Sequence, residues 1–217
     1  MAQLSHKIPV TPWRASSTWG LRGVTAVPLV LGLTLFGMGE GLLVVDRWGA
    51  TPWTVFAQGV SAHTHLSIGW ATAAISMVVL LAWWPLRERP GIGTLANFAI
   101  IALVLNVTAD LVPTPHDAFL KAVVVITAVM VIGIGSALYL TTGLGPGPRD
   151  GLMTSLHRRL GVSVVYVRLT LEVLVLIIGW FMGGTVGVGT AFFAATIGFS
   201  VGMSLQATDR LVRWYQR

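Results

Sequence analysis

Residues 27–36 read Val-Pro-Leu-Val-Leu-Gly-Leu-Thr-Leu-Phe and lie in an apolar run that extends over 26–45. A bilayer core about 30 Å thick is crossed by about 20 mostly apolar helical residues. The run is long enough, and its proline lies near the expected membrane interface, where a missing backbone N–H costs little. Five more segments meet the same criterion. The sequence therefore predicts six transmembrane helices, at 26–45, 67–86, 92–112, 119–141, 163–182 and 186–206.

The composition is that of a membrane protein. Hydrophobic residues make up 54% of the 217 residues and charged residues only 10%, and the mean hydropathy is +0.78. A soluble domain carries roughly 25% charged residues, so this chain has too few to cover a water-facing surface. The formal charge of +6 does not indicate nucleic-acid binding, because the basic residues lie at the ends of apolar segments and form no continuous stripe.

The residue types do not favour catalytic or metal chemistry. The chain has no cysteine, which excludes disulfides, thiolate nucleophiles and sulfur ligands to a metal. The five histidines form no metal-ligand pattern with acidic neighbours, and no motif pairs a nucleophile with a base. We therefore expect no enzymatic activity, no cofactor and no metal site.

The distribution of lysine and arginine predicts the orientation in the membrane. With the N-terminus inside, one side receives eleven basic residues and the other side two, Arg47 and Lys121. Cytoplasmic loops carry an excess of basic residues, so both termini are predicted to be cytoplasmic. The arm 1–25 and the tail 208–217 then lie inside, where basic side chains meet anionic lipid headgroups. The eleven are Lys7, Arg14, Arg22, Arg87, Arg89, Arg149, Arg158, Arg159, Arg210, Arg213 and Arg217.

The chain contains an internal repeat. A shift of 96 residues aligns the two halves without a gap, and the matches are mainly Gly, Pro, Ser, Thr and Trp, which have special backbone or interfacial roles. For example, Gly91-x-Gly93-Thr94 falls on Gly187-x-Gly189-Thr190. Residues 26–113 and 119–207 are thus predicted to be two three-helix repeats of an all-α membrane protein. Because three is odd, the second repeat is inverted, an architecture found in many transporters.

Each repeat also contains a short segment between its first two spans. The segments 49–59 and 143–154 begin with Gly/Pro turns and continue as short amphipathic helices, each with a proline near the first helical position. Such helices either lie flat at the interface or re-enter the membrane with their N-terminal dipoles aimed at a site. Both interpretations stay open. We expect Asp150 to cap the second short helix.

Three ionisable residues fall inside predicted spans, where a centred charge costs about 2.5–3.5 kcal/mol on insertion scales. Glu40 has glycines on both sides, and Arg168 lies four residues before Glu172, so these two share a helix face and can pair. We hypothesise that all three face a polar interior between the repeats; the alternative is a structural pair that holds two helices together. With the short segments they give the candidate substrate-binding residues Glu40, Pro52, Trp53, Gln58, Pro148, Arg149, Asp150, Arg168 and Glu172.

Several motifs point to a known family. The second repeat reads Gly-Pro-Gly-Pro-Arg-Asp-Gly-Leu-Met-Thr over 145–154 and continues with Glu172 and the glycine-rich stretch 183–190. The first repeat has Gly-Glu-Gly over 39–41 and Pro-Trp-Thr at the start of 52–59, which ends in Gln-Gly. These motifs resemble those of the bacterial YczE-like membrane proteins and, more loosely, of the YitT and YyaS proteins. The resemblance covers nearly the whole chain and implies a membrane fold and a bacterial plasma (inner) membrane location, but no particular chemistry.

The expected function is a permease-like or transporter-like role for an unidentified small solute. The alternative is a non-transporting membrane partner that regulates cytoplasmic biosynthetic enzymes through its basic inner loops. Dependence of function on a buried site would favour the first, whereas dependence on Arg158, Arg159 and the basic tail alone would favour the second. The expected partners are membrane lipids and the solute, not nucleic acid, and a homodimer stays open.

Overall fold

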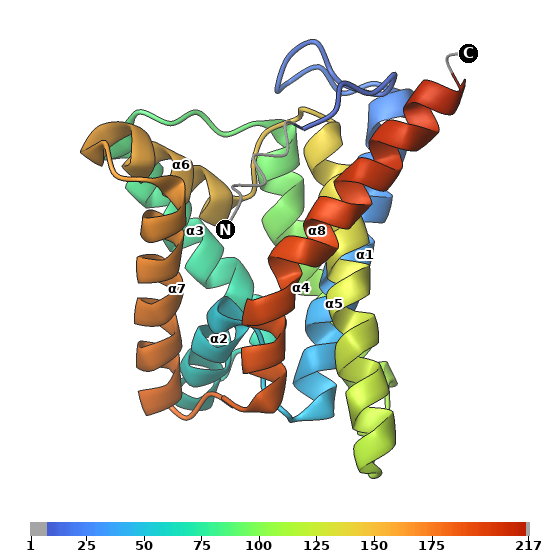
Figure 1. The fold of residues 1–217 in the computed structure, drawn as a ribbon. Helices are drawn as coiled ribbons and strands as arrows, with labels where there is room; N and C mark the ends of the chain where they lie inside the picture. Colours follow the sequence, from blue (N-terminus) through green and yellow to red (C-terminus); the bar gives the residue numbers. More distant parts are fainter. Residues whose placement is uncertain (1–7, 216–217) are drawn as a thin grey trace.

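The computed structural model describes residues 8–215, and within this range the chain forms helices and no strands (Figure 1). Six of the helices are long and apolar enough to cross a membrane, as the sequence predicts. Two shorter helices, α2 and α6, lie where the Gly/Pro-initiated segments are. The helices are α1 Gly23–Asp46, α2 Pro52–His63, α3 Ile68–Leu86, α4 Ile92–Leu111, α5 Ala118–Thr141, α6 Pro148–Leu160, α7 Val164–Phe181 and α8 Val188–Tyr215.

The helix starts follow from side chains that the sequence supplies. Thr51 precedes α2 and accepts a hydrogen bond from the backbone N–H of Thr54, while Pro52 takes the first helical position. At both proline-initiated helices the missing N–H is one that the first turn leaves unpaired in any case. Asp117 caps α5 by accepting from the backbone N–H groups of Phe119 and Leu120.

Helix α8 is longer than predicted. We expected a span that ends at 206 and a separate tail over 208–217, but the helix continues to Tyr215. Two features explain the continuation. Asp209 and Arg213 are four residues apart and form an ion pair at 2.9 Å, and Val212 is buried against the rest of the molecule. Residues 216–217 of the predicted tail lie outside the described range.

Helices α1 and α5 pack against each other, and glycines allow their close approach. A Cβ added at Gly32 would lie 2.7 Å from the Gly135 carbonyl oxygen, and one added at Gly135 would lie 2.5 Å from the Gly32 carbonyl oxygen. Any larger side chain would push the two backbones apart. Small residues allow this close approach at interfaces between membrane helices. Helix α4 packs on the other side of α1, and α8 packs on α5.

The short helices pack across the two halves of the chain. Helix α2 of the first half packs on α7 of the second, and α6 of the second packs on α3 of the first. In Figure 1, α2 lies toward one end of the molecule and α6 toward the other. The N–H of Gly93 donates to the Leu144 carbonyl at 2.8 Å, and the N–H of Gly189 donates to the Trp48 carbonyl at the same distance. These two hydrogen bonds are equivalent, because the shift of 96 superposes Gly93 on Gly189 and Trp48 on Leu144.

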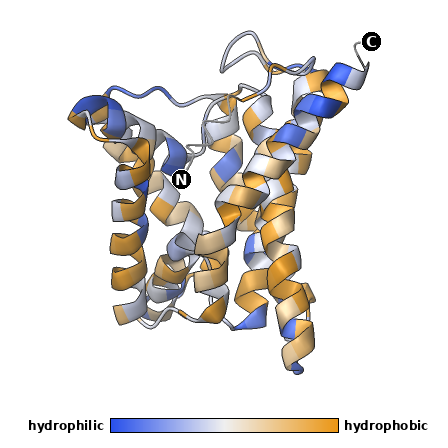
Figure 2. Ribbon diagram, viewed as in Figure 1, coloured by the Kyte–Doolittle hydropathy of each residue, from blue (hydrophilic) through white to orange (hydrophobic). Residues whose placement is uncertain are grey.

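Hydrophilic residues gather at the two ends of the bundle (Figure 2). Residues 8–22 lie at the end that also holds the C-terminal turns of α8 (Figure 1). This arm is anchored, because the Thr11 hydroxyl donates to the Thr141 carbonyl at 3.1 Å and the N–H of Ala15 donates to the Thr142 carbonyl at 2.8 Å. It therefore covers the chain segment that leads from α5 into α6.

Candidate functional site

A cavity of about 150 Å³ lies between the two halves of the chain. Each of the eight helices contributes at least one residue to its wall. A cavity of about this size holds a benzene molecule, so the space suits a solute of a few heavy atoms. The polar and charged lining residues are Glu40, Thr51, Thr72, Ser76, Asn97, Ser136, Tyr139, Arg149, Asp150, Arg168 and Glu172.

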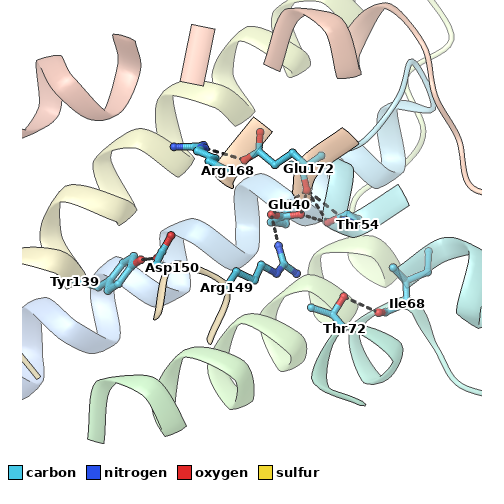
Figure 3. Close-up of polar contacts among 10 residues, drawn as sticks. Glu40, Thr54, Ile68, Thr72, Tyr139, Arg149, Asp150, Arg168 and Glu172 are labelled. Atoms are coloured by element: carbon cyan, nitrogen blue, oxygen red, sulfur yellow. Dashed lines mark hydrogen bonds and ion pairs between the residues drawn. The ribbon is translucent and has the colours of Figure 1, made fainter. Parts of the chain in front are cut away.

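Glu40 is the most deeply buried charged group in this wall. Its residue exposure is 2%, and its carboxylate oxygens lie 3.1 and 3.2 Å from the Thr51 hydroxyl. The Thr54 hydroxyl donates to the same carboxylate (Figure 3). Both threonines belong to the start of α2, so the first turn of this helix is held against α1. Because buried polar groups are costly without partners, these hydroxyls are what allows a carboxylate at this depth.

The backbone beside Glu40 is fixed by its flanking glycines. A Cβ at Gly39 would lie 2.5 Å from the Ile132 side chain, and one at Gly41 would lie 2.6 Å from Thr108. Helix α1 therefore packs directly on α5 and α4 on either side of the carboxylate. The Gly-Glu-Gly motif thus positions one charged side chain at the junction of three helices.

Arg149 approaches Glu40 from the other half of the chain. Its Nη1 lies 3.8 Å from Glu40 Oε1 (Figure 3). Its guanidinium carbon lies 5.1 Å from the centre of the Trp53 ring. The position over the ring is that of a cation–π contact. Trp53 and Arg149 are themselves superposed by the shift of 96. The starts of α2 and α6 therefore meet at the cavity.

Asp150 does not cap its own helix as expected. Its Oδ2 instead accepts a hydrogen bond from the Tyr139 hydroxyl at 2.5 Å (Figure 3). Tyr139 is 3% exposed, so its hydroxyl needs such an acceptor. This bond ties the first turn of α6 to α5. Nothing in the sequence pattern distinguished Tyr139, because an aromatic residue near the end of an apolar span is usually an interfacial anchor.

Arg168 and Glu172 form the predicted pair on α7. Arg168 Nε donates to Glu172 Oε1 at 2.8 Å, and both residues line the cavity. The Arg168 side chain is 45% exposed and that of Glu172 is 18% exposed. The pair therefore lies at the edge of the site, whereas Glu40 lies in its depth. The hypothesis that Glu40, Arg168 and Glu172 face one polar space agrees with this arrangement.

Seven of the nine candidate residues line the cavity, and two do not. Gln58 lies farther along α2, where its Oε1 accepts from the N–H of Thr185 at 2.8 Å. Pro148 lies behind the wall, and its carbonyl accepts from Trp83 Nε1 at 3.0 Å. Both residues hold elements together across the two halves of the chain.

The sequence did not point to the serine and threonine residues of the wall, although the repeat offered a signal for three of them. The shift of 96 superposes Ser76 on Glu172 and Thr72 on Arg168. It also superposes Ser136 on Glu40. Serine and threonine inside a membrane helix can bond to their own backbone, so each is inconspicuous alone. Their match to charged positions of the other half was the usable signal.

Comparison with known proteins places the chain among uncharacterised proteins. A family model described as "Family of unknown function (DUF6198)" matches residues 24–206. An "Uncharacterized protein" of Haemophilus influenzae is 42% identical over 204 residues, which is 94% of each chain. The "Uncharacterized membrane protein YczE" of Bacillus subtilis is 29% identical over 84% of this chain and 86% of its own length. The "Uncharacterized protein YyaS" of the same organism is 22% identical over 74% and 82%.

These matches confirm the resemblance to the YczE-like membrane proteins that the motifs indicated. No solved structure matches the chain.

Proposed function

Because the chain belongs to the family of unknown function DUF6198, we propose its function from its own geometry: it is a permease-like membrane protein that carries a small solute. The cavity between the two halves carries this proposal. Charged and polar side chains form part of its wall, it is large enough for a small solute, and six of the helices around it are apolar enough to lie in a bilayer. Five ionisable side chains line it, and because each charge in the bilayer is costly, ionisable residues within membrane spans are characteristic of substrate and ion pathways.

We further propose that residues 26–113 and 119–207 are inverted repeats. The reciprocal hydrogen bonds of Gly93 and Gly189 support this, as does the reciprocal packing of α2 on α7 and of α6 on α3. Two similar halves of opposite direction can exchange conformations, which opens a shared site to one side and then to the other. The cavity lies at the place where such a mechanism requires the site.

The short helices act as re-entrant half-helices in this proposal. Residues 51–53 at the start of α2 and 147–150 at the start of α6 contribute to the cavity wall. A helix that lay flat at the interface would not reach a site between the spans. The N-terminal ends of both helix dipoles are therefore directed at the solute site, as in transporters with broken helices.

The location in the bacterial inner membrane with both termini in the cytoplasm is part of the same proposal. The end of the molecule that holds residues 8–22 and the last turns of α8 carries Arg14, Arg22, Arg210 and Arg213. This concentration of basic residues fits the cytoplasmic side, and the matched relatives are bacterial.

The test uses the natural absence of cysteine, which makes single-cysteine variants directly informative. Ser76→Cys and Ser136→Cys place a small thiol in the cavity wall, one from each half. Each is reconstituted in sealed vesicles and exposed to a membrane-impermeant thiol reagent from either side. Ala99→Cys, at an exposed position of α4 in the apolar span, is the matched lipid-facing control.

An alternating-access carrier predicts that both cavity thiols react from both sides, while the lipid-facing thiol reacts from neither. Reaction from one side alone, or from neither, would contradict the carrier. The chain would then be better explained as a membrane partner of cytoplasmic proteins, which would contact it through the exposed residues Arg158 and Arg159.

A further inference from the structure

The charges around the cavity nearly cancel. Three carboxylates line it, those of Glu40, Asp150 and Glu172, and two guanidinium groups, those of Arg149 and Arg168. The starts of α2 and α6 also line it, and each helix N-terminus acts as about +0.5 elementary charge. The side chains alone sum to one negative charge, and the two helix ends offset it. A ligand with a net charge would therefore unbalance the site inside the membrane, where an uncompensated charge is costly.

The site nevertheless holds unused binding capacity of both signs. Arg149 Nη1 is 3.8 Å from Glu40, which is beyond hydrogen-bond length, so its donors are not saturated by that carboxylate. Arg168 contacts Glu172 through Nε alone among the described residues. The second oxygens of Glu172 and Asp150 accept no hydrogen bond from any described residue. Donors and acceptors thus stand ready for a ligand that carries both kinds of charge.

Trp53 supplies an independent sign of a missing ligand. The residue lines the cavity and is 6% exposed, and its Nε1–H has no hydrogen-bond partner within residues 8–215. A buried indole N–H normally has an acceptor. Because Arg149 lies over the ring of the same residue, an acceptor that meets the indole N–H lies close to a guanidinium as well. A carboxylate fits this combination.

From these observations we infer that the cavity binds a small zwitterion, a solute with one ammonium and one carboxylate group, such as a short α-amino acid. The carboxylate is held by Trp53 and Arg149, and the ammonium by Glu172 and Asp150. The size agrees, because a cavity of about 150 Å³ takes a molecule of the size of benzene. This inference rests on the proposed function and names the substrate class of the same site.

The test is a set of four molecules of one size and shape. L-Alanine carries both charges, L-alaninamide only the positive one, L-lactate only the negative one, and L-lactamide neither. The thermal unfolding of the purified full chain is measured as each is titrated. We expect L-alanine at saturation to raise Tm by roughly 5–10 °C, the shift that a ligand at about a hundred times Kd gives in a chain of this size. The other three should give less than half of that rise.

Two variants check that the effect arises in this cavity. Glu172→Gln removes the negative charge that faces the ammonium and should abolish most of the rise with L-alanine. Trp53→Phe removes the indole donor and should weaken L-alanine binding by roughly tenfold, as the loss of one hydrogen bond to a charged group does. The control is Glu88→Gln, because Glu88 pairs with Arg158 outside the cavity and should leave the rise unchanged.

The other outcomes with the four molecules would overturn the inference. A larger rise with L-alaninamide would make the site a cation site, and a larger rise with L-lactate would make it an anion site. If all four molecules raise Tm equally, or if none raises it, the site does not recognise a ligand that carries charges of both signs. Two-sided reaction of the cavity thiols without an L-alanine effect would keep the carrier and reject the zwitterion. An L-alanine effect with reaction of the thiols from one side only would keep the zwitterion site and reject the carrier.

Discussion

At the scale of single residues, the contact between Glu40 and Arg149 joins the two halves of the chain through charge. Each is expensive to bury alone, and removal of one partner of a buried pair typically costs about 3–5 kcal/mol. The pair is assisted by the hydroxyls of Thr51 and Thr54 on one side and by the ring of Trp53 on the other. Its members should therefore depend on each other energetically, although they are 3.8 Å apart.

A double-mutant cycle tests this dependence. Glu40→Gln and Arg149→Met should each destabilise the protein, and the double variant should lose less than the sum, with a coupling energy of about 1–3 kcal/mol. Reversible unfolding in mixed detergent micelles gives the values. The control cycle uses Glu88 and Arg158, where the arginine side chain is 61% exposed and the coupling should stay below about 1 kcal/mol. Additive effects at Glu40 and Arg149 would contradict the coupling.

The sequence predicted the ionisable members of the wall because a charge inside an apolar span is conspicuous and costly. Tyr139 could not be predicted, since its role depends on an acceptor from a helix that is distant in space until the chain folds. Gln58 was selected as a polar member of the first short segment and its motif, but its amide holds the turn before α8 at Thr185. Polarity thus indicated that a residue needs a partner, and only the fold showed that the partner of Gln58 is a backbone N–H of the other half.

At the scale of elements, the turns that lead into the short helices combine a left-handed backbone conformation with close packing. Gly49 has φ +119° and Gly145 has φ +114°, a region that other residues rarely adopt. A Cβ at Gly49 would lie 2.4 Å from the Thr190 hydroxyl, and one at Gly145 would lie 2.8 Å from the Thr94 hydroxyl. Each turn therefore presses against the start of the last span of the other half.

Substitution at these turns should loosen the short helices. Gly49→Ala and Gly145→Ala combine an unfavourable backbone conformation with a steric conflict, and each should cost about 1–3 kcal/mol of stability. Gly198→Ala is the control, because a Cβ there meets nothing within 4 Å in the middle of α8 and should leave Tm unchanged or raise it. Equal Tm values for all three variants would show that the turns are not under this constraint.

The element boundaries were largely predictable from the sequence, whereas the helix faces were not. The apolar runs and their caps gave the six spans. In a bilayer, however, both the protein interior and the lipid are apolar, so no hydrophobic stripe marks the packed face. The same limit left the short helices undecided between interface and re-entry. Contacts such as that between Gly59 and Gly179 fix how α2 packs on α7, and such contacts leave no trace in the hydrophobic pattern.

At the scale of the whole molecule, the proposed orientation places the α3–α4 loop inside and the α4–α5 loop outside. Arg89→Cys and His116→Cys put a thiol in an exposed position of each loop. In intact cells, an impermeant thiol reagent should label His116→Cys and not Arg89→Cys, and permeabilisation should make both react. The unmodified chain, which lacks cysteine, is the blank. Labelling of Arg89→Cys alone in intact cells would reverse the orientation.

The close packing of α1 on α5 has a consequence for how the protein is made. The ribosome delivers the first half to the bilayer before α5 exists, so the glycine face of α1 at Gly32 initially meets acyl chains. Helix α2 likewise has no α7 to rest on, and Trp48 has no Gly189 to accept from. The nascent first half is therefore an unfinished intermediate that is completed only by late translation. A chain truncated after Leu111 should therefore be degraded by membrane proteases. A second half supplied as a separate polypeptide should protect the truncated chain.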